Sequence, residues 1–400
     1  MNRDGAQGSR GAGAQGRREK GADRRLRRRT VHRVEIRISR SFPSPLRGLL
    51  LAACCLVVTG ARADVVERRG AEPAVQGTVT LIDEAGVVLR SPLGAVHFIP
   101  WDRVRGVQTD RTDPTLAARM KTAVDLWRAR SRVERHDTTL AEPVLERLFE
   151  MYHGSTHETA LVVAEGLLRC RVARADQVLA VIPALDVARL RRAGVTTHAY
   201  ATLDPEFDTQ YALCTVVAAV WLPSPRLELL ARDLAAYDAQ GDEVVEALAN
   251  EYRNAVLRTL GRTPDPAATS IDHPGIDLMK RLNACRSEDP DTRSAAREQL
   301  RRAIPKMPPW AEAWARYQIG VSLLAEKGIG RRQKGAVSLI HLPARFNRTH
   351  PFLAGLALAE VAAALETADD AAAAATLRSE LNRIYPNHPL HASSGAPSDG

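Results

Sequence analysis

Two short groups of polar residues carry the side chains best suited to chemistry. His153 and His157 are four residues apart, but Gly154, Ser155 and Thr156 separate them. Two histidines at this spacing bind zinc together when a helix continues between them, and the intervening residues favour a turn instead. We therefore predict no metal site at this pair.

Carboxylates alternate at Asp204, Glu206 and Asp208. Oxygen ligands of this kind bind calcium, so the three residues form a possible cation cluster, although the glycine and the distal glutamate of a calcium loop are absent. The alternative is that they are solvated carboxylates of a turn. Because His198 and Tyr200 lie nearby, residues 194–224 are where a catalytic site would be expected.

The remaining sequence offers no catalytic signature. It contains no cysteine-pair zinc motif, HExxH, GxSxG, Walker loop or GxGxxG after a strand. We therefore predict no catalytic residues, no bound metal and no cofactor.

A targeting segment is predicted at the N-terminus. Arg47 precedes the apolar run 49–58, and Ala61, Arg62 and Ala63 follow it, as in a secretory signal peptide cleaved after Ala63. The run is too short for a bilayer span, which needs about 20 residues. We expect an exported protein, periplasmic or extracellular. No methionine lies between Met1 and Met120, so translation from a valine such as Val31 or Val34 would not be recognised, and we expect the start at Met1 to be over-extended. In the alternative, Cys54 becomes a lipidated N-terminus and tethers the protein to a membrane.

Charge and cysteine usage change once residues 1–63 are set aside. Residues 1–63 hold 15 Lys and Arg but only 4 Asp and Glu, so they account for all of the formal charge of +9 and the rest of the chain is slightly acidic, at about −2. A basic surface able to replace phosphate counterions is therefore absent, and we predict no nucleic-acid partner.

Only Cys170, Cys214 and Cys285 remain outside the leader. They are interpreted as buried apolar residues, with a bridge or a reactive thiol as the alternative.

The first part of the body, 64–110, is predicted to be a small β unit. Residues 75–107 alternate with the period of a strand, and turn residues at 83–86 and 91–94 divide them into a three-stranded meander, to which Val104 and Val107 add a short fourth strand. The pattern is similar to the opening of Sm-like and SH3-like small barrels. A complete barrel needs about five strands, and a helix starting at Pro114 leaves no room for the last.

Helix signals dominate from Asp113 onward, giving a mainly α fold. We predict helical hairpins over 111–193, in which Thr139 and Glu142 form a capping box and Pro183 ends, kinks or delays a helix over 177–192. Residues 194–224 are predicted to be irregular, and either packed against the helices or functional. Helices then resume over 225–386, and 387–400 is predicted to be a disordered tail.

Apolar and small residues recur with a fixed spacing near the C-terminus. Ala296, Leu300, Ala303 and Pro308 stand at intervals of 4, 3 and 5 residues. This spacing resembles the second helix and closing proline of a tetratricopeptide repeat, and three degenerate units cover about 277–386. The fold class is therefore a small antiparallel β meander followed by antiparallel helix hairpins in an α-solenoid-like array.

The resemblance implies a concave binding groove on the first helix of each unit. Its predicted lining is Arg281, Trp314, Tyr317, Val321, Leu324, Ala359 and Ala363. Because the lining is mostly apolar, it suits an apolar segment, either of a partner or of this chain. Trp314 and Tyr317 as ordinary core residues are the alternative.

These observations predict a non-catalytic, exported scaffold that binds a protein or peptide partner. The alternative is an exported hydrolytic enzyme with its site in 194–224. Membrane attachment is expected only through Cys54, and a small-molecule ligand is left open.

Overall fold

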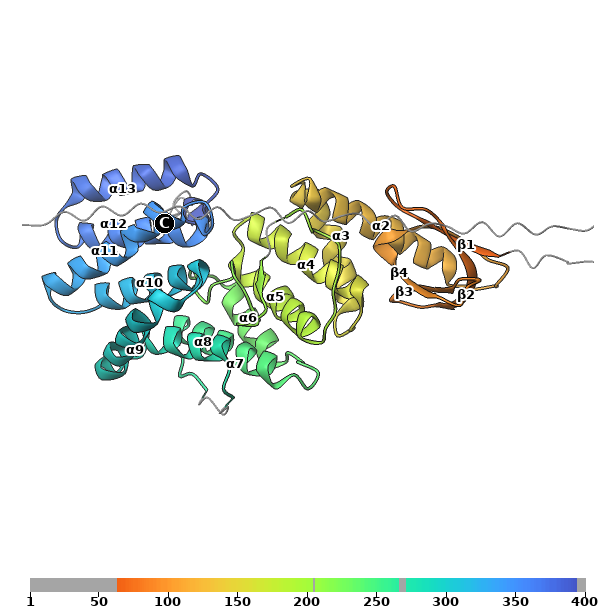
Figure 1. Cartoon of the computed structure of the whole chain (residues 1–400). Helices are drawn as coiled ribbons and strands as arrows, with labels where there is room; N and C mark the ends of the chain where they lie inside the picture. Colours follow the sequence, from red (N-terminus) through yellow and green to blue (C-terminus); the bar gives the residue numbers. More distant parts are fainter. Residues whose placement is uncertain (1–62, 204–205, 266–270, 394–400) are drawn as a thin grey trace, which may run out of the picture. The chain divides into compact units, whose positions relative to one another are not determined.

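The computed structural model describes residues 63–203, 206–265 and 271–393. A small N-terminal antiparallel sheet is followed by helix hairpins that pack against each other, which confirms the predicted fold class (Figure 1). Nearly all of the predicted leader, with Cys54, lies outside the described residues. No helix within these ranges has the length and apolar character needed to cross a membrane.

The sheet has five strands in the order β4-β3-β2-β1-β5. They are β1 (Asp64–Arg68), β2 (Val75–Ile82), β3 (Gly86–Arg90), β4 (Val96–Pro100) and β5 (Val104–Gln108), with a 3-10 turn η2 (Trp101–Arg103) before β5. The prediction that a fifth strand had no room is wrong, because β1 supplies it from ahead of the meander and pairs with both β2 and β5. Adjacent Val65 and Val66 hid this short strand, since they break the polar–apolar alternation.

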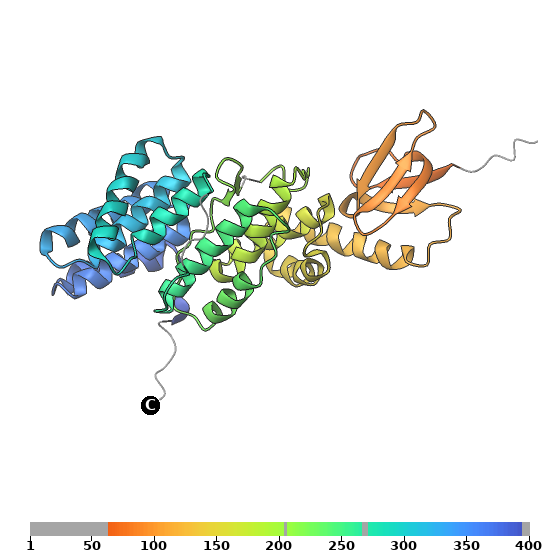
Figure 2. The ribbon, with the colours of Figure 1, turned by 90° about the horizontal axis from the view of Figure 1, so that it is seen from below.

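Trp101 joins the sheet to the helices. Its ring is fully buried, and its indole N–H donates to the carbonyl of Asp83 at 2.9 Å. Its backbone N–H donates to Thr159 Oγ1 at 3.3 Å, and the Thr159 hydroxyl donates to the carbonyl of Ala85 at 2.6 Å. Asp102 forms an ion pair with Arg130 of α2 (Leu116–Glu134), which runs beside the strands in both views (Figures 1 and 2).

Helices α2, α3 (Thr138–Tyr152), α4 (Glu158–Ala173) and α5 (Gln177–Arg192) pack in succession. Nearly every residue of α4 from Thr159 to Cys170 is buried, because α3 and α5 cover it on two sides. The predicted capping box of Thr139 and Glu142 does not form. The N-cap of α3 is Asp137, and Glu142 points instead to Arg174.

Pro183 neither ends nor delays its helix, as two of the three predicted outcomes required, because α5 continues across it. Proline cannot donate to the carbonyl four residues earlier, which here belongs to Leu179. That carbonyl accepts a hydrogen bond from Arg171 Nη1 at 2.6 Å. A side chain from α4 therefore replaces the donor that α5 lacks.

The segment after α5 packs against the helices. It carries the short pair β6 (Phe207–Asp208) and β7 (Leu213–Cys214), and its apolar residues at 212–214 and 217–221 are buried. The Tyr200 hydroxyl donates to the carbonyl of Val162 at 3.0 Å, and the Tyr252 hydroxyl donates to the carbonyl of Val217 at 2.8 Å. Helices α6 (Arg226–Ala235) and α7 (Glu243–Thr259) follow.

Three helix pairs complete the described chain (Figure 1). They are α8 (Pro274–Ala284) with α9 (Pro290–Ala303), which runs into the 3-10 turn η3 (Ile304–Lys306), α10 (Pro309–Leu324) with α11 (Ile329–Phe346), and α12 (Pro351–Glu366) with α13 (Ala371–Ile384). Gly320 allows close contact between α10 and α11, because a Cβ there would stand 2.5 Å from Leu339 Cγ. A single turn, α14 (Leu390–Ser393), lies within the predicted tail.

Candidate functional site

An open cleft of about 750 Å³ lies between α3, α5 and α6. Side chains reach it at helical spacing: Phe149 and His153 from α3, Val178 and Ile182 from α5, and Leu229 from the first turn of α6. Its lining is Glu146, Phe149, Glu150, His153, Arg171, Val178, Leu179, Ile182, Arg226, Leu229, Leu230, Asp233, Ala236 and Tyr237. The apolar members are half-buried or exposed with few exceptions, and Leu229 is 52% exposed. The cleft therefore offers an accessible apolar surface.

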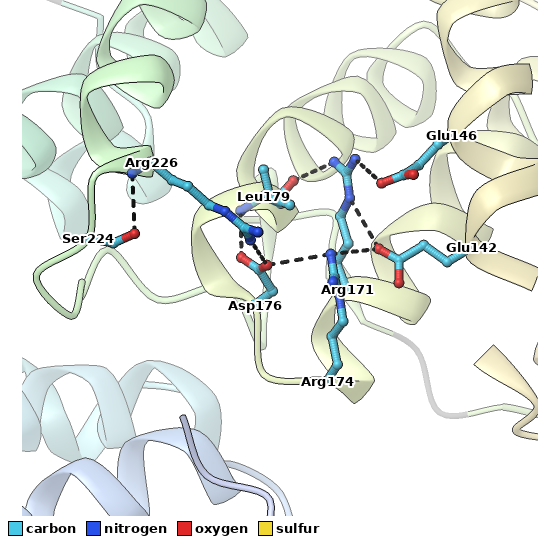
Figure 3. Close-up of polar contacts among 8 residues, drawn as sticks. All are labelled: Glu142, Glu146, Arg171, Arg174, Asp176, Leu179, Ser224 and Arg226. Atoms are coloured by element: carbon cyan, nitrogen blue, oxygen red, sulfur yellow. Dashed lines mark hydrogen bonds and ion pairs between the residues drawn. The ribbon is translucent and has the colours of Figure 1, made fainter. Parts of the chain in front are cut away.

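Figure 3 shows a network of arginines and carboxylates, of which Glu146, Arg171 and Arg226 line the cleft. Arg171 approaches Glu146 at 3.2 Å and Glu142 at 3.8 Å, and Arg174 approaches Glu142 at 2.8 Å. Asp176, which caps α5 by accepting from the Leu179 N–H, binds Arg226 of α6 at 2.7 Å.

The network joins four helices and is balanced in charge. Glu142 and Glu146 come from α3, Arg171 and Arg174 from the end of α4, Asp176 from the cap of α5, and Arg226 from α6. Each arginine in it therefore has a carboxylate partner, which leaves little positive charge to attract an anion.

A buried carboxylate contacts two side chains of the cleft lining, His153 and Tyr237. Asp186 of α5 is 2% exposed and accepts from the Tyr237 hydroxyl at 3.0 Å and from Arg189 Nε at 3.4 Å. His153 Nδ1 lies 2.9 Å from its second oxygen. The pKa of His153 is raised, and the largest cause is the hydrogen bond to Asp186. Partial burial of the ring opposes this rise. The Arg189 guanidinium also donates to the Ser155 carbonyl, which fixes the turn after α3.

Two carboxylates on the rim remain without neutralisation. Glu150 and Asp233 are exposed, and neither has an ion-pair partner within the ranges that the structure describes. The uncompensated charge at the cleft is therefore negative.

The residues predicted to line a groove differ from one another in burial. Trp314 is 1% and Tyr317 is 4% exposed, so both rings belong to the core as this structure has it. Val321 and Leu324 are half-buried against that core, Ala359 is half-buried and Ala363 is exposed. Arg281 contacts Asp277, one turn earlier on its own helix, at 3.5 Å.

The chain's own β6–β7 hairpin contacts the start of α10. The Tyr211 and Trp310 rings meet edge to face with centroids 5.1 Å apart, and Trp310 Nε1 donates to Asp208 at 3.0 Å. The Tyr211 carbonyl also lies so close to Gly275 that a Cβ there would be 1.9 Å from it. A segment of this chain thus packs where α8 and α10 begin.

The carboxylates of the possible cation cluster have protein partners. Glu206 approaches Arg169 at 3.4 Å, and Asp208 accepts from Trp310 and from the N–H groups of Gln210 and Tyr211. Asp204 lies outside the described residues. No group of three or more metal-ligating side chains gathers within the part of the chain that is described.

A cavity of about 250 Å³ lies beside Glu206. Glu165 and Arg191 also line it, and their charges meet at 2.9 Å, while Arg169 approaches Glu165 at 3.0 Å. The carboxylates here are therefore paired with arginines.

The three described cysteines are buried and unbridged. Burial raises the pKa of the Cys170 and Cys285 thiols to about 12, so both stay protonated at neutral pH. Their geometry agrees with the interpretation of these residues as small apolar side chains.

Neither a family model, a curated protein nor a solved structure matches this chain. The function must therefore be argued from the cleft itself. Sequence reasoning missed the cleft because its residues come from four helices, α3 to α6, and from the segment after α6, and a single sequence does not show how these pack together. One signal was present: Glu146, Phe149, Glu150 and His153 form one polar–apolar face of α3.

Proposed function

We propose that this protein is a non-catalytic scaffold that binds a basic, amphipathic segment of a protein partner in the cleft between α3, α5 and α6. The observation that supports the proposal is an open apolar surface whose uncompensated charges, Glu150 and Asp233, are both acidic. An amphipathic helix buries its apolar face in such a groove, and its Lys or Arg residues complement the acidic rim.

The preference for a basic segment follows from the charges. Arg171 and Arg226 are held by Glu146 and Asp176, so an acidic segment would gain little from them. It would also meet Glu150 and Asp233 with like charge, which disfavours binding. The Phe149 and Tyr237 rings add faces over which a cation is attracted.

Three helical peptides of equal length test the proposal: one of Leu and Lys, one of Leu and Glu, and one of Ser and Lys. We expect saturable binding of the first alone by fluorescence anisotropy, weakening as salt rises. Glu150→Lys with Asp233→Lys should weaken binding by about 10-fold, because each exposed charge pair contributes up to about 1 kcal/mol. Leu229→Ser should weaken it without changing the salt dependence.

The matched control is Glu84→Lys with Asp110→Lys. These residues are also exposed acids but do not line the cleft, so the change in net charge is the same. Equal loss of binding in both double variants would mean general charge attraction and would overturn the proposal.

The alternative, a hydrolytic enzyme with its site in 194–224, draws support from the cavity that Glu206 and Glu165 line. It predicts turnover in a panel of ester, amide, glycoside and phosphate substrates that is lost in Glu206→Gln and kept in the cleft variants. If the protein is a non-catalytic scaffold, we expect no turnover from the unchanged protein, from Glu206→Gln or from the cleft variants.

We further propose that the protein is exported, with residues 1–63 removed, and that α8 to α13 form tetratricopeptide-like units. The order of basic, apolar and small residues supports export, and the three successive helix pairs support the repeat. N-terminal sequencing of the natural protein tests export. A mature chain that retains residues 24–29 would contradict it.

A further inference from the structure

The turn between α10 and α11 carries an exposed basic segment (Figure 1). Residues 327–334 read Lys-Gly-Ile-Gly-Arg-Arg-Gln-Lys, and all eight are exposed. No Asp or Glu occurs from Lys327 to Ala359. We call residues 327–337 the basic tip, and none of them lines the cleft or the cavity beside Glu206. Because residues 64–400 as a whole are slightly acidic, their net charge hides this local excess of cations.

The cations of the basic tip are only partly neutralised. Arg331 forms an ion pair with the buried carboxylate of Glu326, but the same carboxylate also binds an arginine of α9. Arg332 donates to the backbone carbonyl of Glu326 at 3.3 Å. Lys327 and Lys334 have no ion-pair partner within the described ranges. The basic tip therefore presents positive charge that the surrounding residues do not balance.

The position of these cations does not favour the helix that carries them. Arg331, Arg332 and Lys334 lie in the first two turns of α11, which begins at Ile329 and has no acidic residue in its first turn. The start of a helix carries partial positive charge, so cations there lower its stability. An anionic partner therefore explains these residues better than the stability of the helix does.

Two large apolar side chains of the basic tip are exposed to water. Ile329 is 77% exposed and lies between Gly328 and Gly330, and Val337 is 73% exposed two turns further along α11. Val337 lies on the side of the helix opposite to its buried residues, which are Gly335, Leu339, Leu342 and Phe346. The basic tip is therefore amphipathic, because it offers apolar side chains and cations in one exposed segment.

This combination fits a lipid bilayer better than a peptide or a nucleic acid. A peptide is held in a groove, and no cavity described above includes the tip. Single-stranded nucleic acids stack on aromatic rings, and the one Phe, Tyr or Trp of α11, Phe346, is 3% exposed. The interface of a bilayer instead accepts apolar side chains between the headgroups and cations against the phosphates.

We propose that the basic tip binds the surface of an anionic phospholipid bilayer. Ile329 and Val337 enter the headgroup layer, and Lys327, Arg332 and Lys334 lie against lipid phosphates. Each cation near such a surface strengthens binding by about 5-fold, so the contact is reversible and sensitive to salt. It needs no lipid attached at Cys54, which was the only membrane contact that the sequence predicted.

Co-sedimentation with vesicles tests the proposal. The compact unit of the structure begins at residue 62 and contains all of the described core, so the assay uses the chain from Asp64, which lacks the basic leader. We expect binding to mixed vesicles of phosphatidylglycerol and phosphatidylcholine that weakens as salt rises, and at least 10-fold weaker binding to phosphatidylcholine alone. Lys327→Gln with Lys334→Gln should weaken binding by at least 10-fold. Ile329→Ser should weaken it by about 5-fold without changing the salt dependence.

Matched controls change residues of the same type and exposure elsewhere. Lys121→Gln with Lys306→Gln removes two exposed lysines, one from α2 and one from the turn before α10. Leu93→Ser removes a leucine that is 97% exposed in the turn between β3 and β4. Both controls should leave vesicle binding unchanged. Every changed residue is exposed, so all variants should keep the Tm of the parent.

Several results would overturn the proposal. Absence of binding, equal binding to both kinds of vesicle, or equal losses in the two lysine double variants would each contradict recognition of anionic lipid by the basic tip. Binding of duplex DNA or poly-glutamate that depends on Lys327 and Lys334 but not on Ile329 would assign the tip to a nucleic acid or an acidic protein. Displacement by inorganic phosphate, but not by chloride of the same ionic strength, would assign it to a free anion. Binding of the Leu and Lys peptide in the cleft should be unaffected by the tip variants, so the two proposals can fail separately.

Discussion

Asp186 shows how one carboxylate can hold the side chains of a cleft in place. It accepts from Tyr237 and Arg189 and contacts His153, so it connects α3, α5 and the segment after α6. Nothing in the sequence singled it out, because its partners lie 33 and 51 residues away. His153 was examined as a metal ligand, and the structure gives it a carboxylate partner instead.

Asp186→Ala should destabilise the fold. The substitution leaves Arg189 buried without its charge partner, and breaking such a pair costs about 3–5 kcal/mol. Urea unfolding followed by circular dichroism measures the loss. Asp110→Ala, an exposed acid in the described chain, is the control and should change the free energy of unfolding by less than about 0.5 kcal/mol.

His153 should make part of the stability depend on pH. Its pKa is raised in the folded state, so its contribution is fully present below about pH 6.5 and is lost as pH rises through the folded-state pKa. In His153→Gln this dependence should disappear between about pH 6 and 8. Chemical denaturation of both proteins across that range gives the difference between their free energies of unfolding. Because both proteins contain His350 and His388, the opposite contributions of these two residues cancel in that difference. A constant difference would contradict the prediction.

At the scale of elements, helix boundaries were predictable and strand β1 and the fate of Pro183 were not. The predicted helix over 177–192 matches α5, because Asp176 caps it and its apolar residues recur at helical spacing. Its continuity depends on Arg171, a residue of another helix. Local sequence rules show that proline removes a hydrogen-bond donor from its helix, but they do not show that a side chain of a neighbouring helix supplies another.

A double-mutant cycle tests this repair. Arg171→Leu should lower the free energy of unfolding by about 1–3 kcal/mol, since the Leu179 carbonyl loses its donor and Glu146 loses its partner. In a Pro183→Ala background the helix regains its own donor, so the same change should cost about 1 kcal/mol less. Equal costs in both backgrounds would show that Arg171 does not compensate for the proline.

At the scale of the whole described chain, the sheet is attached to the helices through few polar contacts. Composition and periodicity predicted both parts, but not the contacts between them, which include the hydrogen bonds of Thr159 to Ala85 and Trp101 and the ion pair of Asp102 with Arg130. The cleft was unpredictable for the same reason. Its walls come from segments whose packing a single sequence does not reveal.

Thr159→Val should loosen this attachment. Valine keeps the shape but leaves the Trp101 N–H and the Ala85 carbonyl without the hydroxyl, at a cost of about 1–3 kcal/mol. We expect faster hydrogen exchange in β3 and β4 and little change in α10 to α13. Uniform acceleration throughout the chain would indicate a general loss of stability instead.

The hydrogen bond from Arg171 to Leu179 also affects the order in which residues 171 and 183 can be substituted during evolution. A lineage that keeps Pro183 is bound to keep an arginine, or another long donor, at 171. Once the proline has been replaced, the Leu179 carbonyl no longer needs the arginine, and only the contacts with Glu146 and Glu142 still favour an arginine at 171. In descendants of this gene, loss of the proline should therefore precede loss of the arginine, and the reverse order should be selected against.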